Sequence, residues 1–323
     1  MYRIALFLGL TFVLQPPNLA LAVDTRDTRF LHEPAVGKDR IVFVYADDLW
    51  TSRLDGSDVR RLTSHPGPES SPFLSPDGET VAFTGTYDGN ADVYVIPIAG
   101  GEPTRLTWHP GDDVVRGFTP EGAVLFSSQR QVFTNRFAQF FTVGTKGGFP
   151  TRLPIPSGER AAYSPDGKLL AYTPLPEAFR QWKNYRGGRN SRIWILTLDG
   201  LSVEQVPQPE SRCNDTYPMW VGDALYFLSD RDGEFNLYAY ERSSKKIERL
   251  SLYDQFPIDA ASVARARSST SRPGDSTCST LTQGSPNGSR SAWRPTLWRR
   301  GRGLSMSRNT SEAVTFPPAA NAP

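Results

Sequence analysis

The stretch Arg61-Leu62-Thr63-Ser64-His65-Pro66-Gly67 decides the fold, because it returns 44 residues later as Arg105-Leu106-Thr107-Trp108-His109-Pro110-Gly111. A second stretch, Ser75-Pro76-Asp77-Gly78, returns as Thr119-Pro120-Glu121-Gly122 and as Ser164-Pro165-Asp166-Gly167. A repeat of this length, built from short strands and turns, is typical of a β-propeller with one four-stranded blade per repeat. We therefore predict an all-β fold of the propeller type.

Each repeat follows the same order of turns and strands. A glycine turn such as Pro76-Asp77-Gly78 comes first, and a strand such as Val81–Thr84 follows it. A second strand carries an apolar residue and then an aromatic one, and another turn leads to an outer strand. An aromatic ring at one equivalent position suits the packing of neighbouring blades. The five rings are Trp50, Tyr94, Phe141, Trp194 and Tyr238.

The repeat is recognisable over residues 30–258 and then stops. Five blades can be read there, and a sixth would be due where the pattern ends. Residues 259–323 are rich in Ser, Arg and Pro, a composition that does not bury enough apolar surface to fold. We expect a disordered basic tail or an out-of-frame segment, and the abrupt change in mid-architecture favours the shifted frame over a genuine tail.

The charge is divided unevenly along the chain. The net charge is +2, and nine arginines against three acidic residues make residues 259–323 strongly basic. Residues 1–258 are therefore slightly acidic, which argues against a nucleic-acid-binding surface.

The first 22 residues have the pattern of a signal peptide. Arg3 supplies a positive charge, residues 4–14 are mostly apolar, and Ala20-Leu21-Ala22 forms a cleavage site. The apolar run is too short for a stable membrane span, although an uncleaved N-terminal anchor remains the alternative. We expect cleavage after Ala22, export to the periplasm or the exterior, and no stable membrane insertion afterwards.

Motifs for chemistry are absent from the sequence. It has no Gly-x-Ser-x-Gly elbow, no His-Glu-x-x-His helix and no Cys-x-x-Cys pair. We expect no catalytic residue, no metal and no cofactor in this chain. His65 and His109 hold identical places before Pro-Gly, which favours a bond from each ring nitrogen to its own turn over a metal site.

One long loop, residues 179–192, is the candidate binding site. Basic and aromatic residues alternate there, so the loop could hold a carboxylate-ended peptide through arginine forks and ring contacts. A packed insertion that covers a blade edge is the other interpretation, and long loops in compact folds are often functional. The candidate residues are Phe179, Arg180, Trp182, Lys183, Tyr185 and Arg186.

These stretches together resemble the N-terminal propeller of tricorn-type serine proteases. The most specific are Ala46-Asp47-Asp48-Leu49-Trp50 and the loop at 179–188. Pro218-Met219-Trp220 is a further match, and the SPDG-type turns are shared with TolB-like and WD40-like propellers. The resemblance spans residues 30–258. It implies a six-bladed propeller that acts as a non-catalytic gate or docking surface for peptides, next to a protease core in a homo-oligomeric assembly.

That protease core is not recognisable in this chain, so no catalytic residue is carried over. Enzymatic activity of the chain as it stands is not expected. The alternative function is that of a free-standing TolB-like periplasmic propeller that binds protein partners.

Overall fold

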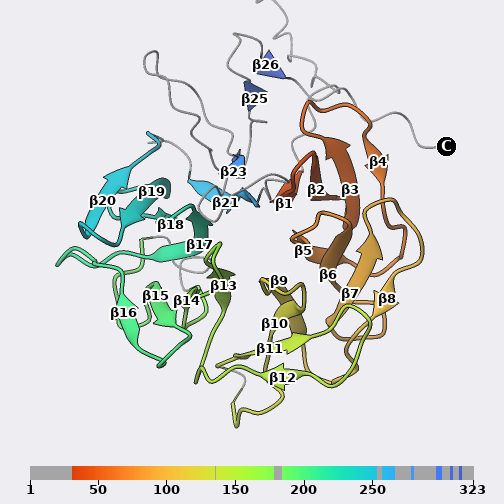
Figure 1. The fold of residues 1–323 in the computed structure, drawn as a ribbon, viewed down its shortest axis with the longest axis horizontal. Helices are drawn as coiled ribbons and strands as arrows, with labels where there is room; N and C mark the ends of the chain where they lie inside the picture. Colours follow the sequence, from red (N-terminus) through yellow and green to blue (C-terminus); the bar gives the residue numbers. More distant parts are fainter. Residues whose placement is uncertain are drawn as a thin grey trace, which may run out of the picture.

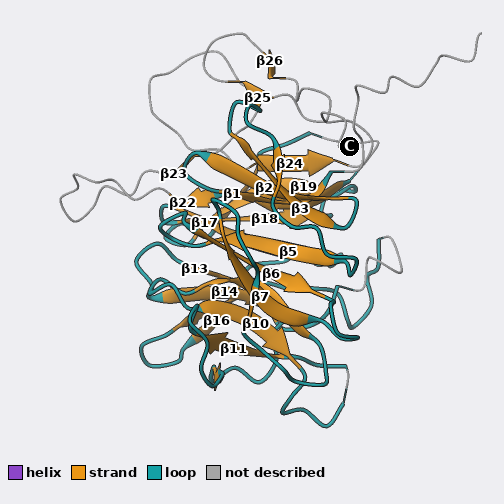
Figure 2. Cartoon of the chain, turned by 90° about the vertical axis from the view of Figure 1, so that its right-hand side faces the viewer, coloured by secondary structure: helices purple, strands orange, loops and turns teal. Residues whose placement is uncertain are grey.

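The computed structural model describes residues 31–134, 136–177, 184–252, 257–265, 278–279, 296–299, 306–307 and 313–314. The predicted signal peptide and most of the predicted tail lie outside these ranges. The described residues form five four-stranded antiparallel sheets, arranged as blades around a common centre (Figure 1). Seen from the side, strands joined by loops make up the described part of the chain (Figure 2). None of it is a helix with the length and hydropathy to span a membrane.

The chain builds each blade from the centre outward. The first blade contains β1 (His32–Val36), β2 (Arg40–Tyr45), β3 (Asp48–Arg53) and β4 (Arg60–Arg61). The second contains β5 (Glu69–Leu74), β6 (Thr80–Gly85), β7 (Asp92–Pro97) and β8 (Thr104–Arg105). The third contains β9 (Asp113–Phe118), β10 (Val124–Ser128), β11 (Gln139–Val143) and β12 (Thr151–Arg152).

The last two complete blades follow the same order. The fourth contains β13 (Arg160–Tyr163), β14 (Leu169–Thr173), β15 (Trp194–Thr197) and β16 (Val203–Gln205). The fifth contains β17 (Asp215–Val221), β18 (Ala224–Ser229), β19 (Asn236–Glu241) and β20 (Lys246–Arg249). The strands beyond them are β21 (Ile258–Ser262), β22 (Ala264–Arg265), β23 (Cys278–Ser279), β24 (Thr296–Arg299), β25 (Met306–Ser307) and β26 (Ala313–Val314).

The expected six-bladed ring is corrected to five complete blades in the described residues. Strand β21 lies where a sixth innermost strand would be, between the first and fifth blades (Figure 1). Among the described residues it pairs with β24 alone, so this sheet has two strands there instead of four. Ile258 and Ala261 pack against the fifth blade, and the Val36 N–H donates to Ser262 Oγ at 3.2 Å. Strand structure therefore continues past residue 258, where the repeat pattern ends.

The innermost strand of each blade is the element that the sequence pattern did not reveal. It precedes the glycine turn, so the repeated aromatic residue lies on the third strand of the blade instead of the second. There it faces an aromatic residue of the second strand, as Tyr94 faces Phe83 and Tyr238 faces Phe227. Both ring pairs are stacked, with centroids 5.7 and 5.9 Å apart.

The hydrophobic core is divided among the contacts between blades. Tyr94 packs with first-blade residues, Phe141 with second-blade residues and Tyr238 with fourth-blade residues. Trp194 lies at the edge of the corresponding cluster between the third and fourth blades. Trp50 differs, because its cluster contains only residues of the first blade and the segment before it. The difference has a structural reason: the first blade faces β21, which belongs to a sheet of only two strands.

The repeated Arg-Leu-Thr stretch has three structural roles. The arginine pairs with the aspartate that begins the third strand, and both Arg61–Asp48 and Arg105–Asp92 measure 2.6 Å. The leucine is buried in a core cluster. The threonine hydroxyl accepts the N–H of the residue after that aspartate, at 2.9 Å for Thr63 and 3.0 Å for Thr107. Three adjacent residues thus attach the outer strand to its blade.

Candidate functional site

The innermost strands enclose a central cavity of about 840 Å³. Strands β1, β5, β9, β13, β17 and β21 all contribute to its wall, so residues from every blade meet there. An innermost strand is an edge strand, because on one of its sides no strand of the described residues pairs with it. What the wall presents to a ligand is therefore set by the side chains of these strands and by their exposed backbone edges.

Three innermost strands share an unusual backbone feature at the same position. Glu33, Ser71 and Tyr217 each precede a proline and have φ between 49° and 52°. Their strands carry an irregularity in register at this point. Positive φ in a residue other than glycine costs about 1–3 kcal/mol and collects at functional positions. The proline that follows each of these residues has no N–H to donate, and proline is therefore tolerated on an edge strand. The missing donor also makes it harder for another strand to pair with this edge.

Arg160 is the centre of a polar cluster at this level of the wall. Its Nε donates to Glu177 Oε1 at 2.5 Å, and one terminal nitrogen donates to the Tyr217 hydroxyl at 2.9 Å. The guanidinium carbon also lies 3.8 Å from the centre of the Tyr217 ring. Glu177 in turn accepts a hydrogen bond from Thr216. The cluster joins the fourth blade, the fifth blade and the connection between β14 and β15.

Two further charged groups, Arg116 and Glu33, line the cavity. Arg116 pairs with Glu159 and donates to Ser127 Oγ at 2.9 Å. Glu33 accepts the backbone N–H of Ser71, which ties the first blade to the second. The positive groups of Arg116 and Arg160 line the cavity, whereas their carboxylate partners do not.

Towards the glycine turns the cavity wall becomes more apolar. Phe73, Phe118, Tyr163 and Trp220 line this part. Burial, with a smaller contribution from nearby Glu121, raises the pKa of the Tyr163 phenol to about 12, so the group is neutral at physiological pH. The cavity is thus polar and charged at one level and aromatic at another, an arrangement that favours ligands carrying both kinds of group.

The predicted binding loop is described in part. Phe179, Arg180, Trp182 and Lys183 lie outside the described residues. Arg186 pairs at 2.6 Å with Asp230, whose side chain is fully buried, and the Tyr185 carbonyl accepts from Asn214 Nδ2 at 2.9 Å. This end of the loop is therefore packed against the fifth blade. Peptide binding by the loop stays a prediction.

His65 and His109 have the same local geometry in consecutive repeats. Nδ1 of each ring accepts the N–H of the glycine two residues later, Gly67 or Gly111, at 3.0 Å. The bond from ring to turn is the one that their repeated position predicts. No group of three or more His, Cys, Asp or Glu side chains in the described ranges is arranged to hold a metal ion.

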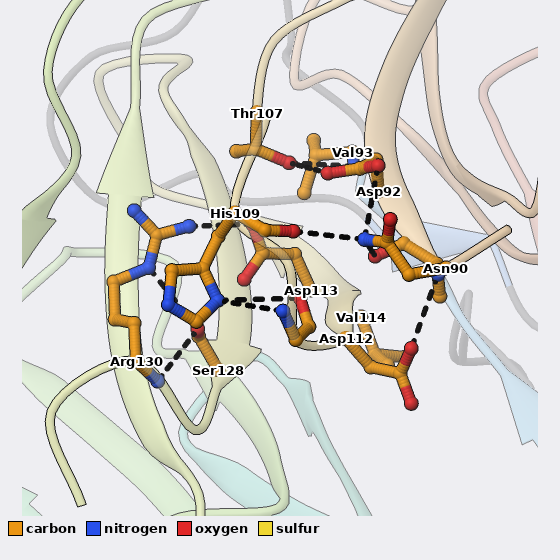
Figure 3. A network of polar contacts seen from close by, with 12 residues as sticks. Asn90, Asp92, Val93, Thr107, His109, Asp112, Asp113, Val114, Ser128 and Arg130 are labelled. Carbon is orange, nitrogen blue, oxygen red and sulfur yellow. Dashed lines mark hydrogen bonds and ion pairs between the residues drawn. The ribbon is translucent and has the colours of Figure 1, made fainter. Parts of the chain in front are cut away.

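His109 belongs to a polar network between the second and third blades (Figure 3). Asn90 Nδ2 donates to the His109 carbonyl at 2.9 Å, and the Ala91 N–H donates to Asp112 at 3.1 Å. Beside it, Arg130 reaches the fully buried carboxylate of Asp113 at 2.5 Å. These bonds hold the link between two blades in place.

The Arg130 pair is repeated in the fifth blade. Arg231 reaches Asp215 at 3.0 Å, and in both blades the arginine Nε donates to a serine hydroxyl two residues earlier at 3.1 Å. Each guanidinium also lies 5.1–5.2 Å from the centres of the two stacked rings of its blade. These pairs were not predicted from the sequence, although Ser128-Gln129-Arg130 and Ser229-Asp230-Arg231 lie at the ends of equivalent strands, β10 and β18.

The second blade replaces this arginine with Tyr87 and the aspartate with Glu69. The Tyr87 hydroxyl donates to Glu69 at 2.5 Å, Thr63 donates to the same carboxyl, and the Leu49 N–H donates at 2.9 Å. Burial raises the pKa of Glu69 above its ordinary value, and the hydrogen bonds only partly oppose this effect. A carboxyl whose pKa is higher in the folded protein than in the unfolded chain stabilises the fold most when protonated.

We therefore expect the contribution of Glu69 to stability to be complete below its unfolded pKa and to be lost as pH rises through its folded pKa. As the pH rises above the ordinary pKa of glutamate, about 4.3, the difference in unfolding free energy between Glu69→Gln and the wild type should shift in favour of the variant. Urea unfolding at a series of pH values measures this difference. Asp166→Asn is the control, because the hydrogen bond from Ser164 lowers the pKa of Asp166 and moves its titration to lower pH. A Gln variant whose relative stability does not change with pH would contradict the expectation.

Comparison with known proteins gives the family. The model of the tricorn protease N-terminal β-propeller domain matches residues 28–268, about three quarters of the chain. The chain belongs to this family. Tricorn protease homolog 1 of Streptomyces coelicolor is 33% identical over 228 residues, which cover 70% of this chain and 21% of that protein. The tricorn protease of Thermoplasma acidophilum is 26% identical over 238 residues, 70% of this chain and 22% of that protein.

Solved structures agree on the fold. The crystal structure of the tricorn protease matches 73% of this chain and 24% of that protein, with a TM-score of 0.65 and 24% identity. The structure described as a putative TolB from Agrobacterium tumefaciens matches 69% of this chain and 81% of that protein, with a TM-score of 0.56 and 19% identity. The chain spans about a fifth of the length of the tricorn proteases and homologs that it matches in sequence.

Proposed function

We propose that this tricorn-family propeller binds peptides in its central cavity and guides them during proteolysis by a tricorn-type protease. The observation that carries the proposal is the cavity itself, with its charged level at Arg116 and Arg160 and its aromatic level at Phe73 and Trp220. Peptides offer charged termini and apolar side chains, so a wall of this kind can hold them. The prolines on the innermost strands favour recognition of side chains and termini over addition of a strand.

Photo-crosslinking tests this proposal. Tyr163, which lines the cavity, is replaced by benzoylphenylalanine, and the same replacement at Phe149, which is fully exposed outside it, is the control. A fluorescent peptide of about eight residues should crosslink to the full chain at position 163 and not at position 149. Equal crosslinking at both positions, or none at 163, would refute peptide binding in the cavity.

The protease partner and the assembly belong to the same proposal. A relative from Sulfurisphaera tokodaii, described as a putative tricorn-like protease N-terminal subunit, is 25% identical over 173 residues and is covered over 85% of its length. That description supports the proposal that this propeller acts as a subunit together with a protease core. Co-purification with a serine protease from the same cells, followed by mass measurement of the complex, would test both the partner and the oligomer.

We also propose that the protein is exported from the cytoplasm. Arg3, the apolar run and Ala20-Leu21-Ala22 support cleavage after Ala22 and a periplasmic or secreted location. N-terminal sequencing of the protein from fractionated cells should give Val23 as the first residue. A chain that starts at Met1 in the membrane fraction would point to the uncleaved anchor instead.

A further inference from the structure

Arg160 stands between the central cavity and a carboxylate of its own chain. The guanidinium lines the cavity and its side chain is 17% exposed. Glu177, its partner, is 4% exposed and lies behind it, on the connection between β14 and β15. A ligand in the cavity therefore meets the arginine first and the carboxylate of Glu177 is shielded from it.

The hydrogen bonds of the Arg160 side chain to Glu177 and Tyr217 leave some of its N–H groups available for a ligand. A guanidinium carries five N–H groups in a planar fork, which matches a carboxylate. The side-chain bonds to Glu177 and Tyr217 use one nitrogen each, Nε and one terminal nitrogen. The Tyr217 ring, 3.8 Å from the guanidinium carbon, fixes the plane of the fork. The arginine is thus held in one orientation, which lowers the entropy lost when an anion binds.

We propose that Arg160 is the carboxylate-binding residue of the cavity and that Glu177 competes with the ligand for it. The proposal rests on the proposed function, since the carboxylate would be carried by a peptide. Two sources share this chemistry, the C-terminal carboxylate and an acidic side chain. Both would face the positive groups of Arg160 and Arg116 while the rest of the peptide extends towards the aromatic level of the wall.

Fluorescence anisotropy with three N-acetylated peptides of one sequence tests the proposal on the full chain. The first ends in a free carboxylate, the second in an amide, and the third in an amide preceded by glutamate. A charge-assisted bidentate contact should make the free carboxylate bind about 10-fold more tightly than the amide. The glutamate peptide shows whether an acidic side chain can replace the terminus.

Two variants should change the preference for the carboxylate peptide over the amide peptide in opposite directions. Arg160→Gln should remove the difference between the carboxylate and amide peptides. Glu177→Gln, which keeps the guanidinium and removes its competitor, should enlarge the difference by about 3-fold or more. Arg152→Gln, on an exposed outer strand, is the matched control and should leave the difference between the two peptides unchanged. Thermal melting of each variant shows that it is folded, and Arg160→Lys replaces Arg160→Gln if the latter does not fold.

The outcomes separate the two proposals. Equal binding of carboxylate and amide peptides to the wild type, with no effect of Arg160→Gln, would overturn the role of Arg160 and leave peptide binding standing. A weaker preference in Glu177→Gln than in the wild type would overturn the competition. If none of the three peptides binds, peptide binding in the cavity and this inference fall together, and the crosslinking result at position 163 identifies that case.

Discussion

Replacement of Arg130 by alanine is expected to lower the free energy of unfolding by about 3–5 kcal/mol, because it leaves a buried carboxylate without its partner. Asp113 is fully buried, and Arg130 meets it at 2.5 Å while stacking on Phe126 and Phe141. The variant would lose the ion pair, the bond to Ser128 and the contact with both rings. Urea unfolding at pH 7, followed by tryptophan fluorescence, measures the change.

Two controls separate the ion pair from general effects. Arg152→Ala removes an arginine of the same blade from an exposed position and should change stability by less than about 0.5 kcal/mol. The double variant Arg130→Met/Asp113→Leu removes both charges, and it should recover much of the lost stability, since a buried pair can be replaced by apolar residues at little cost. A loss below about 1 kcal/mol for Arg130→Ala would show that Asp113 is not held as described.

Replacement of Trp220 by alanine is expected to cost about 3–5 kcal/mol, the usual range for a buried large aromatic residue. Trp220 lies on the innermost strand β17, 5% exposed, and packs in the cluster between the fourth and fifth blades. Its Nε1 donates to the Ala162 carbonyl of the fourth blade at 3.0 Å. The variant should therefore loosen the contact between these two blades as well as open a cavity. Differential scanning calorimetry measures the change in melting.

Trp220→Phe keeps most of the ring and loses the hydrogen bond, so we expect a smaller loss, about 1–2 kcal/mol. Trp108→Ala is the matched control, because Trp108 is 66% exposed and its removal should leave stability nearly unchanged. Similar losses for Trp220→Ala and Trp108→Ala would argue against a specific role of Trp220 between the blades.

Much of the fold was predictable because its signals are local and periodic. The repeat of Arg61–Gly67 at Arg105–Gly111 sets the blade length, and the glycine turns mark hairpin corners that depend on a few adjacent residues. His65 and His109 bond to glycines two residues away, which is a contact that a short stretch of sequence contains in full. Three of the innermost strands were missed because a proline, Pro34, Pro72 or Pro218, interrupts the alternation that is typical of a strand.

The number of blades was harder to predict. The sequence predicted that the pattern ends near residue 258, and the structure adds that β21 begins there and occupies the sixth position. Strand pairing beyond that point joins β21 with β24, more than 30 residues later, and no local pattern indicates such a partner.

The candidate site was decided by tertiary structure alone. Arg160 lies 57 residues from Tyr217 in the sequence and meets it because the innermost strands of neighbouring blades lie side by side. Glu33 reaches Ser71 in the same way.

The sequence by itself therefore determined the repeating blade, its turns and the residues that attach its outer strand, since these depend on neighbours along the chain. Only the tertiary structure decided the cavity and its charged level, since these arise where the blades converge around one centre.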